Sequence, residues 1–203
     1  MTIENSASRW NRVLLDEFAK ESDRAAVILT AAIFDEVLET LLKKRLAPAS
    51  SEPDEVFRSN GAAVELSSKI VLSHRLGLIS SSFRRDLDLI RRIRNDFAHD
   101  VQGCTFESPA VRSRVLELSK SSGLLDRCKP IRDLMPAGTR HDFLFVATWM
   151  LHALNQALEE LKPIPEAALE FGYKYSVTEA EAEEIRSELA QRRGDPLEAS
   201  GRE

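Results

Sequence analysis

Cysteine and closely spaced histidine are scarce in this sequence. The 203 residues include two cysteines, Cys104 and Cys128, without a C-x-x-C spacing, and four histidines that form no H-x-x-x-H pair. These residue types and spacings support neither a zinc site nor a disulfide scaffold. We therefore expect reduced thiols and neither a metal nor another cofactor.

Long apolar segments and turn-forming residues are also few. Aromatic residues make up 6% of the chain, and glycine and proline number 8 each, which disfavours an all-β sandwich. The most apolar run, Ala25–Phe34, is far too short to cross a bilayer and predicts a buried helix. The first ten residues lack the basic region and apolar stretch of a secretory signal. The expectation is a cytoplasmic protein that does not bind membranes.

An excess of positive charge is absent as well. The 28 lysines and arginines against 33 acidic residues give a net charge of −5, which excludes a globally basic nucleic-acid binder but not a local basic patch. The acidity is confined to residues 163–203, which hold ten acidic and five basic residues, whereas residues 1–162 hold 23 of each. The sequence also lacks a glycine-rich phosphate loop, a G-x-S-x-G motif and an acidic metal cluster, which disfavours a small-molecule enzyme.

Apolar residues recur at helical spacing through most of the chain, without the sustained alternation that is typical of strands. The pattern predicts an all-α protein in which residues 1–162 form a bundle of five or six helices and residues 163–203 form an acidic, partly disordered tail. One short helix in the tail begins at a capping box of Thr178 and Glu181. The helices predicted for the bundle span about residues 8–19, 22–46, 65–76, 80–98, 109–118 and 140–161, with loops at 49–63 and 127–138.

The most informative segment is residues 83–100, FRRDLDLIRRIRNDFAHD. On a helical wheel at 100° per residue, its polar and apolar residues separate onto two faces. Four arginines on the polar face are candidates for binding RNA or DNA, although a solvated helix face explains the same pattern: Arg84, Arg85, Arg91 and Arg92. Arg94 falls in the apolar half, and we interpret it as the single break in the pattern. A guanidinium there must pair with another group or lie at the rim of an interface.

The sequence RNDFAH at the end of this segment resembles the motif of the HEPN superfamily, in which an arginine, often followed by asparagine, precedes a histidine by a short spacer. That motif lines a cleft between two helical protomers, and active members cut RNA without a metal. The resemblance implies that Arg94 binds the scissile phosphate, His99 performs acid–base chemistry, and Asn95 orients His99 or the phosphate. Structural roles stay open: Arg94 could pair with Asp35 or Glu36, and His99 could complement the dipole at its helix end.

A longer resemblance covers about residues 25–118. It consists of the apolar helix at residues 25–46, S-x-K-I-x-L at Ser67–Leu72, L-G-L-I-S at Leu76–Ser80 and the arginine-rich helix that follows. These segments resemble the MltR-like family, named for the mannitol operon repressor. Its members are transcriptional regulators without a recognisable DNA-reading domain. The resemblance implies a homodimer that controls transcription through a protein partner rather than by reading DNA directly.

Three hypotheses for the function follow from these patterns. The first is a non-enzymatic, MltR-like transcriptional regulator of the repressor type that acts as a helical dimer. The alternative is a HEPN-type, metal-independent endoribonuclease, or an RNA-binding relative, that uses Arg94, Asn95 and His99. The third is a structural dimerisation module, in which neither Arg94 nor His99 has a chemical role.

Overall fold

A computed structural model describes residues 18–100, 103–134, 136–167 and 177–193 of the chain. The regular secondary structure of these residues is entirely helical, which confirms the predicted all-α class. The chain divides into two compact units, Met1–Glu166 and Ala167–Glu203. The helix predicted over residues 8–19 lies outside the described residues, except where the short 3-10 helix η2 (Phe18–Lys20) begins.

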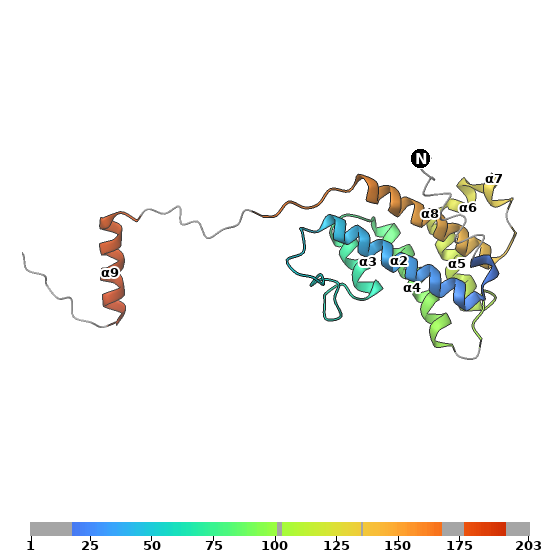
Figure 1. The fold of residues 1–203 in the computed structure, drawn as a ribbon, viewed down its shortest axis with the longest axis horizontal. Coiled ribbons are helices and arrows are strands. Elements are labelled where there is room, and N and C mark those ends of the chain that lie inside the picture. The colour runs from blue at the N-terminus through green and yellow to red at the C-terminus, as the bar shows by residue number, and fades with distance from the viewer. Residues whose placement is uncertain (1–17, 101–102, 135, 168–176, 194–203) are drawn as a thin grey trace, which may run out of the picture. The chain divides into compact units, whose positions relative to one another are not determined.

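The first unit is a bundle in which five long helices and two short ones are described (Figure 1). They are α2 (Asp23–Arg45), α3 (Leu66–Arg75), α4 (Ser81–His99), α5 (Pro109–Ser122), α6 (Leu124–Arg127), α7 (Lys129–Arg132) and α8 (Thr139–Glu160). The second unit contains α9 (Glu179–Arg193). Among the described residues, the first unit is therefore a helical bundle and the second holds one helix.

Local capping signals set the ends of several helices. The hydroxyls of Ser22 and Ser80 each accept a hydrogen bond of 3.2 Å from the backbone N–H three residues later, at the starts of α2 and α4. Gly77, with a φ of +71°, follows the end of α3. The backbone N–H of Thr178 donates to the Glu181 carboxylate at 2.9 Å, and the Glu181 N–H donates back to the Thr178 hydroxyl. The predicted capping box of α9 is therefore present.

The chain between α4 and α8 is more helical than the sequence pattern predicts. Helix α5 continues to Ser122 instead of ending near residue 118, because Gly123 adopts the left-handed conformation (φ +59°) that ends a helix. The predicted loop at 127–138 contains α7, in which Pro130 lies in the first turn. A proline there does not disrupt the helix, because the N–H that it lacks would have no partner within the helix.

The core of the bundle is built around α2 and α4. Helix α2 packs against α3, α4 and α8, while α4 also packs against α3 and α5. Three aromatic rings connect α4 to α8. The ring centroid of Phe106 lies 5.4 Å from that of Phe97 and 5.5 Å from that of Phe143. All three are almost completely buried. Burial of the apolar faces, rather than any single helix, holds the bundle together.

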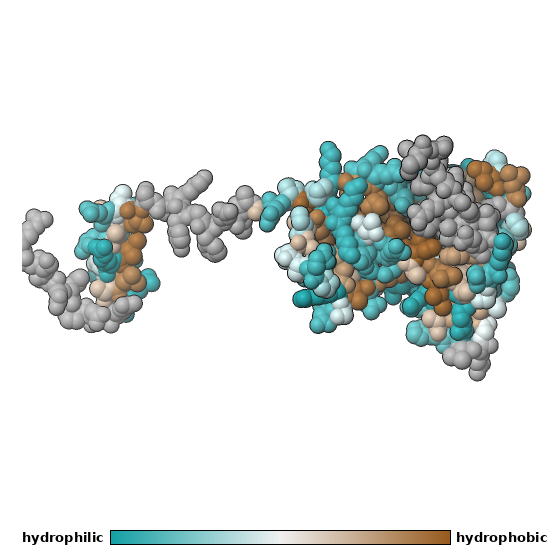
Figure 2. All heavy atoms as spheres, viewed as in Figure 1, coloured by the Kyte–Doolittle hydropathy of each residue, from teal (hydrophilic) through white to brown (hydrophobic). Residues whose placement is uncertain are grey.

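Some apolar side chains reach the surface of the bundle. Figure 2 shows them among hydrophilic side chains over α2 and near α7, where Leu29, Ile131 and Leu134 are exposed. Scattered exposure of this kind is ordinary for a folded protein. None of the described helices is long and apolar enough to cross a membrane.

Candidate functional site

Helix α4 carries all of the candidate site residues that the sequence indicated, and it distributes them among three pockets. Helix α4 packs against α2, α3 and α5, and its polar side chains line the pockets between α4 and these neighbours. Three candidate arginines line one pocket, Arg91, Arg94 and Asn95 line a second, and Asn95 and His99 line a third.

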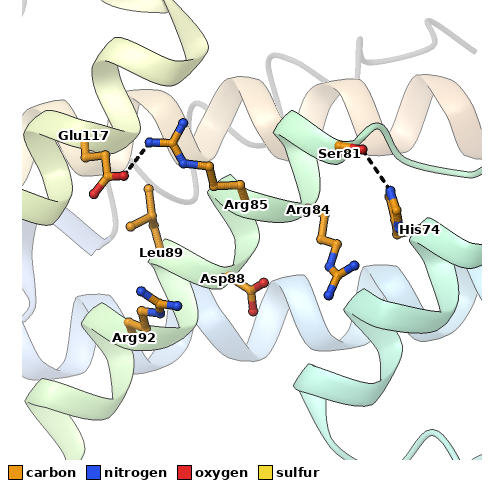
Figure 3. Close-up of a pocket in the computed structure, with 8 residues that line it drawn as sticks. All are labelled: His74, Ser81, Arg84, Arg85, Asp88, Leu89, Arg92 and Glu117. Carbon is orange, nitrogen blue, oxygen red and sulfur yellow. Dashed lines mark hydrogen bonds and ion pairs between the residues drawn. The ribbon is translucent and has the colours of Figure 1, made fainter.

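The first, which we call the arginine pocket, has a volume of about 370 Å³ and lies between α3, α4 and α5. Figure 3 shows Arg85 extended toward Glu117 on α5, whereas Arg84 extends to the opposite side, toward α3. Asp88 lies between Arg84 and Arg92 in the same view. The pocket is lined by His74, Ser81, Arg84, Arg85, Asp88, Leu89, Arg92 and Glu117.

Carboxylates neutralise two of the four candidate arginines. Arg85 forms an ion pair with Glu117, and hydrogen bonding to that carboxylate raises the pKa of Arg85. The Nε of Arg91 donates to Oδ1 of Asp88 at 3.4 Å. Neither of these guanidiniums is left as an uncompensated cation for a phosphate backbone.

The remaining arginines of the pocket, Arg84 and Arg92, pair with no residue that the structure describes. Three arginines and two carboxylates line the pocket, so its net charge is +1 with histidine neutral. His74 adds a polar wall: its Nε2 lies 3.1 Å from the Ser81 hydroxyl oxygen, and its buried Nδ1 has no partner among the described residues. The pocket is thus a mixed-charge surface with a small positive excess.

The second pocket, of about 350 Å³, lies between α2, α4 and the start of α3. Arg94 is exposed at its edge, and its Nη1 donates to Oδ1 of Asn95 at 3.2 Å. No described residue forms an ion pair with Arg94, so the structure does not show the suggested pairing with Asp35 or Glu36. Asp35 lines the same pocket, but its Oδ2 accepts a hydrogen bond of 2.7 Å from Lys69.

His99 lies in the third pocket, of about 450 Å³, between the end of α4 and the start of α5. Its side chain is exposed, and Asn95 lines this pocket as well as the second one. Arg94 and His99 therefore open into different pockets of one chain, as expected from their separation of about 140° on a helical wheel. Asp96, which also lines the third pocket, forms an ion pair with Arg114 of α5.

The cysteines and other metal-ligating groups do not gather. Cys104 and Cys128 are both free thiols, the first buried at the wall of the third pocket and the second half-buried. Across the described ranges, no three His, Cys, Asp or Glu side chains lie close enough together to hold a metal ion.

The interpretation of Arg94 as the single break in the pattern of α4 is wrong, because Asp86 breaks it more strongly. On the same wheel Asp86 lies about 200° from Arg84, in the middle of the apolar half. It is 5% exposed, whereas Arg94, near the edge of that half, lies at the surface. Burial raises the pKa of Asp86, although a hydrogen bond from Ser121 acts in the opposite direction. The position of this acidic residue in the apolar half of the wheel could have identified it from the sequence.

A second buried charge that the sequence patterns did not indicate is Lys69 of α3. The residue is 2% exposed, and its Nζ lies 2.7 Å from Oδ2 of Asp35 and 2.8 Å from Oε2 of Glu39, both on α2. Burial lowers the pKa of Lys69, but the two carboxylates outweigh it and raise the pKa overall. The sequence signals for Lys69 are its place in the S-x-K-I-x-L segment and its position beside the apolar Ile70, which is also buried.

Comparisons with known proteins give one distant structural likeness. The chain matches no protein-family model, and the search of curated proteins finds no match. Among solved structures, it is similar to a chain in the "X-ray structure of the MtlR-HPr complex from Escherichia coli", with a TM-score of 0.53 and 17% sequence identity. The similarity covers 71% of this chain and 97% of the matched one. At this identity the likeness shows the fold, so the helical bundle has an MtlR-like fold.

Proposed function

We propose that this chain is an MltR-like transcriptional regulator of the repressor type that acts as a helical dimer through a protein partner. The charge pattern of α4 carries most weight. A nucleic-acid track needs several uncompensated cations, whereas carboxylates pair with Arg85 and Arg91 and leave two of the four candidate arginines unpaired. Arginines set among carboxylates, with Leu89 in the same pocket, are typical of surfaces that recognise proteins.

The structural likeness supports the same function. The matched chain belongs to a complex of MtlR with HPr, which is itself a protein, and the likeness extends over nearly all of that chain. Between residues 25 and 118 the sequence also resembles the MltR-like family, which is named for the mannitol operon repressor. A fold solved together with a protein partner is consistent with control of transcription through protein contacts.

We expect reversal of the two unpaired arginines to abolish regulation. In a host strain that lacks this chain, transcripts of the controlled operon should rise, and the wild-type gene should return them to their normal low level. The Arg84→Glu/Arg92→Glu protein should leave these transcripts high, because it changes the charge of the arginine pocket from +1 to −3. RNA sequencing of the complemented strains measures this effect.

The matched control is Arg58→Glu/Arg112→Glu, which makes the same change of charge at exposed positions outside the arginine pocket. It should complement as well as the wild type. Unchanged transcripts in the strain without the chain, or full complementation by Arg84→Glu/Arg92→Glu, would refute the proposed function. The mass of the purified proteins in solution should correspond to two chains for all variants.

A metal-independent endoribonuclease is the second candidate function. Its support is that Arg94 and His99 are both exposed, and that no described acid is paired with Arg94. Because the two side chains open into separate pockets of one chain, a nuclease site would have to combine Arg94 of one protomer with His99 of another. Asn95, which lines both pockets, would then lie between the phosphate-binding and the proton-transferring group.

Incubation with RNA in EDTA separates the two functions. For a regulator, we expect purified wild-type protein to leave total RNA intact, and the Arg94→Ala and His99→Ala variants to complement transcription normally. Gel electrophoresis of the RNA measures cleavage, and circular dichroism checks that all three proteins are folded. Cleavage by the wild type that is lost in both variants would instead establish the endoribonuclease.

A further inference from the structure

Asp86 is a buried acid without a dedicated partner for one of its oxygens. It lies in the second turn of α4 with 5% of its surface exposed. Its Oδ1 is closed to solvent and accepts no hydrogen bond from any described residue. Leaving a buried carboxylate oxygen unsatisfied destabilises the folded protein, so a buried acid of this kind calls for a group that binds it.

Asp86 lies at the wall of a fourth pocket, separate from the three on the candidate site. This pocket, which we call the Asp86 pocket, has a volume of about 440 Å³ and lies between the start of α4, the end of α5, α6 and α8. Its size is that of a small-molecule site. The rings of Phe83 and Trp149 and the hydroxyls of Ser82 and Ser121 lie at its wall.

The cations near Asp86 are directed to other groups. Arg85, the preceding residue, forms an ion pair with Glu117 of α5. Arg127 lines the Asp86 pocket, but its guanidinium donates to the backbone carbonyl oxygens of Ser122 and Gly123. The charge of Arg85 acts to lower the pKa of Asp86, but no described residue forms an ion pair with Asp86.

Apart from Arg127, whose guanidinium is bound to backbone carbonyl oxygens, the pocket wall carries groups that favour a positive charge. The carboxyl end of α5, where helix carbonyls give a partial negative charge, is at Ser122 on the pocket wall. The faces of Phe83 and Trp149 attract cations through their ring quadrupoles. A metal ion lacks ligands here, because no cluster of three metal-binding side chains occurs among the described residues. An organic cation can instead use the carboxylate and the rings together.

We propose that the Asp86 pocket binds a small organic ammonium ion, whose N–H groups donate to the Asp86 carboxylate and whose apolar part packs against Trp149 and Phe83. The site is independent of the proposed regulatory function, because it shares no residue with the arginine pocket. It lies where α4, α5, α6 and α8 meet, so a bound ligand would lie against four helices of the bundle.

Titration with phenethylammonium tests the site, with its neutral isostere 2-phenylethanol as the second probe. We expect the ammonium probe to shift the NMR signal of the Trp149 indole N–H in the full-length protein. The Asp86→Asn variant should bind it about tenfold or more weakly, because a charge-assisted hydrogen bond is lost. 2-Phenylethanol should bind wild type and variant equally weakly.

Asp88→Asn is the matched control, since it removes the same charge from the same helix but outside the Asp86 pocket. It should bind phenethylammonium like the wild type. The Asp86→Asn protein should melt no earlier than the wild type, because the substitution removes a buried charge. Equal affinity of wild type and Asp86→Asn, equal affinity for the two probes, or no binding of phenethylammonium up to about 10 mM would each overturn the proposal.

Discussion

Replacement of Lys69 by methionine is expected to lower the free energy of unfolding by about 3 kcal/mol. The Lys69 side chain is 3% exposed and lies between Asp35 and Glu39, whose side chains are 36% and 29% exposed. Methionine preserves most of the apolar volume but leaves two like charges four residues apart on α2 without their shared cation. Their partial exposure limits the loss, because water solvates part of each carboxylate. Urea unfolding followed by circular dichroism measures the change.

The effect of Lys69→Met should depend on pH in a defined way. Burial raises the pKa of Glu39, but hydrogen bonds with Lys43 and Lys69 outweigh it and lower the pKa below the ordinary 4.5. A lowered acid pKa stabilises the fold above the ordinary value, and this stabilisation is lost as the pH falls through the folded-state pKa. The raised pKa of Lys69 stabilises the fold below its ordinary 10.5 and is lost as the pH rises through the folded-state value. The difference between wild type and variant should be largest between about pH 5 and 10.

The triple variant Lys69→Met/Asp35→Asn/Glu39→Gln is the control for this prediction. It removes the buried cation and both carboxylates together and leaves only Lys43, which is exposed to water, without its partner Glu39. We therefore expect it to recover most of the lost stability. A Lys69→Met protein as stable as the wild type at neutral pH would show that the ion pairs do not hold α3 against α2.

Replacement of Phe97 by alanine is expected to lower the free energy of unfolding by about 4 kcal/mol. The Phe97 ring is completely buried and packs 5.4 Å from Phe106, which in turn contacts Phe143 of α8. Truncation removes the apolar contacts of α4 near its end and leaves a cavity that the surrounding helices fill only in part. The midpoint of urea unfolding measures the loss, with an unchanged slope as the check that the transition stays two-state.

Two further variants make the Phe97 prediction specific. Phe97→Leu keeps most of the buried volume and should be clearly more stable than Phe97→Ala. Leu116→Ala, at a position on α5 that is 55% exposed, should change the stability by less than about 0.5 kcal/mol. Equal losses in Phe97→Ala and Leu116→Ala would contradict the central place of the three aromatic rings.

The helices of this protein are largely determined by their own residues. Ser22 and Ser80 cap the helices that follow them because a serine hydroxyl reaches a backbone N–H only three residues away. Thr178 and Glu181 form their capping box for the same reason. The all-α class also follows from spacing, since apolar residues one helical turn apart must face a common core. Interactions of this range can be predicted from a single stretch of sequence.

Only the tertiary structure decides which charges are buried and which are paired. Asp35 and Lys69 are 34 residues apart in sequence, and Arg85 and Glu117 are 32 apart, so neither pair is visible in a local pattern. The helical wheel places Asp86 and Arg94 in the same apolar half, yet Asp86 is buried and Arg94 is exposed. The outcome depends on where neighbouring helices cover α4, because packing between distant segments, and not the residues of α4, sets the solvent exposure of each side chain.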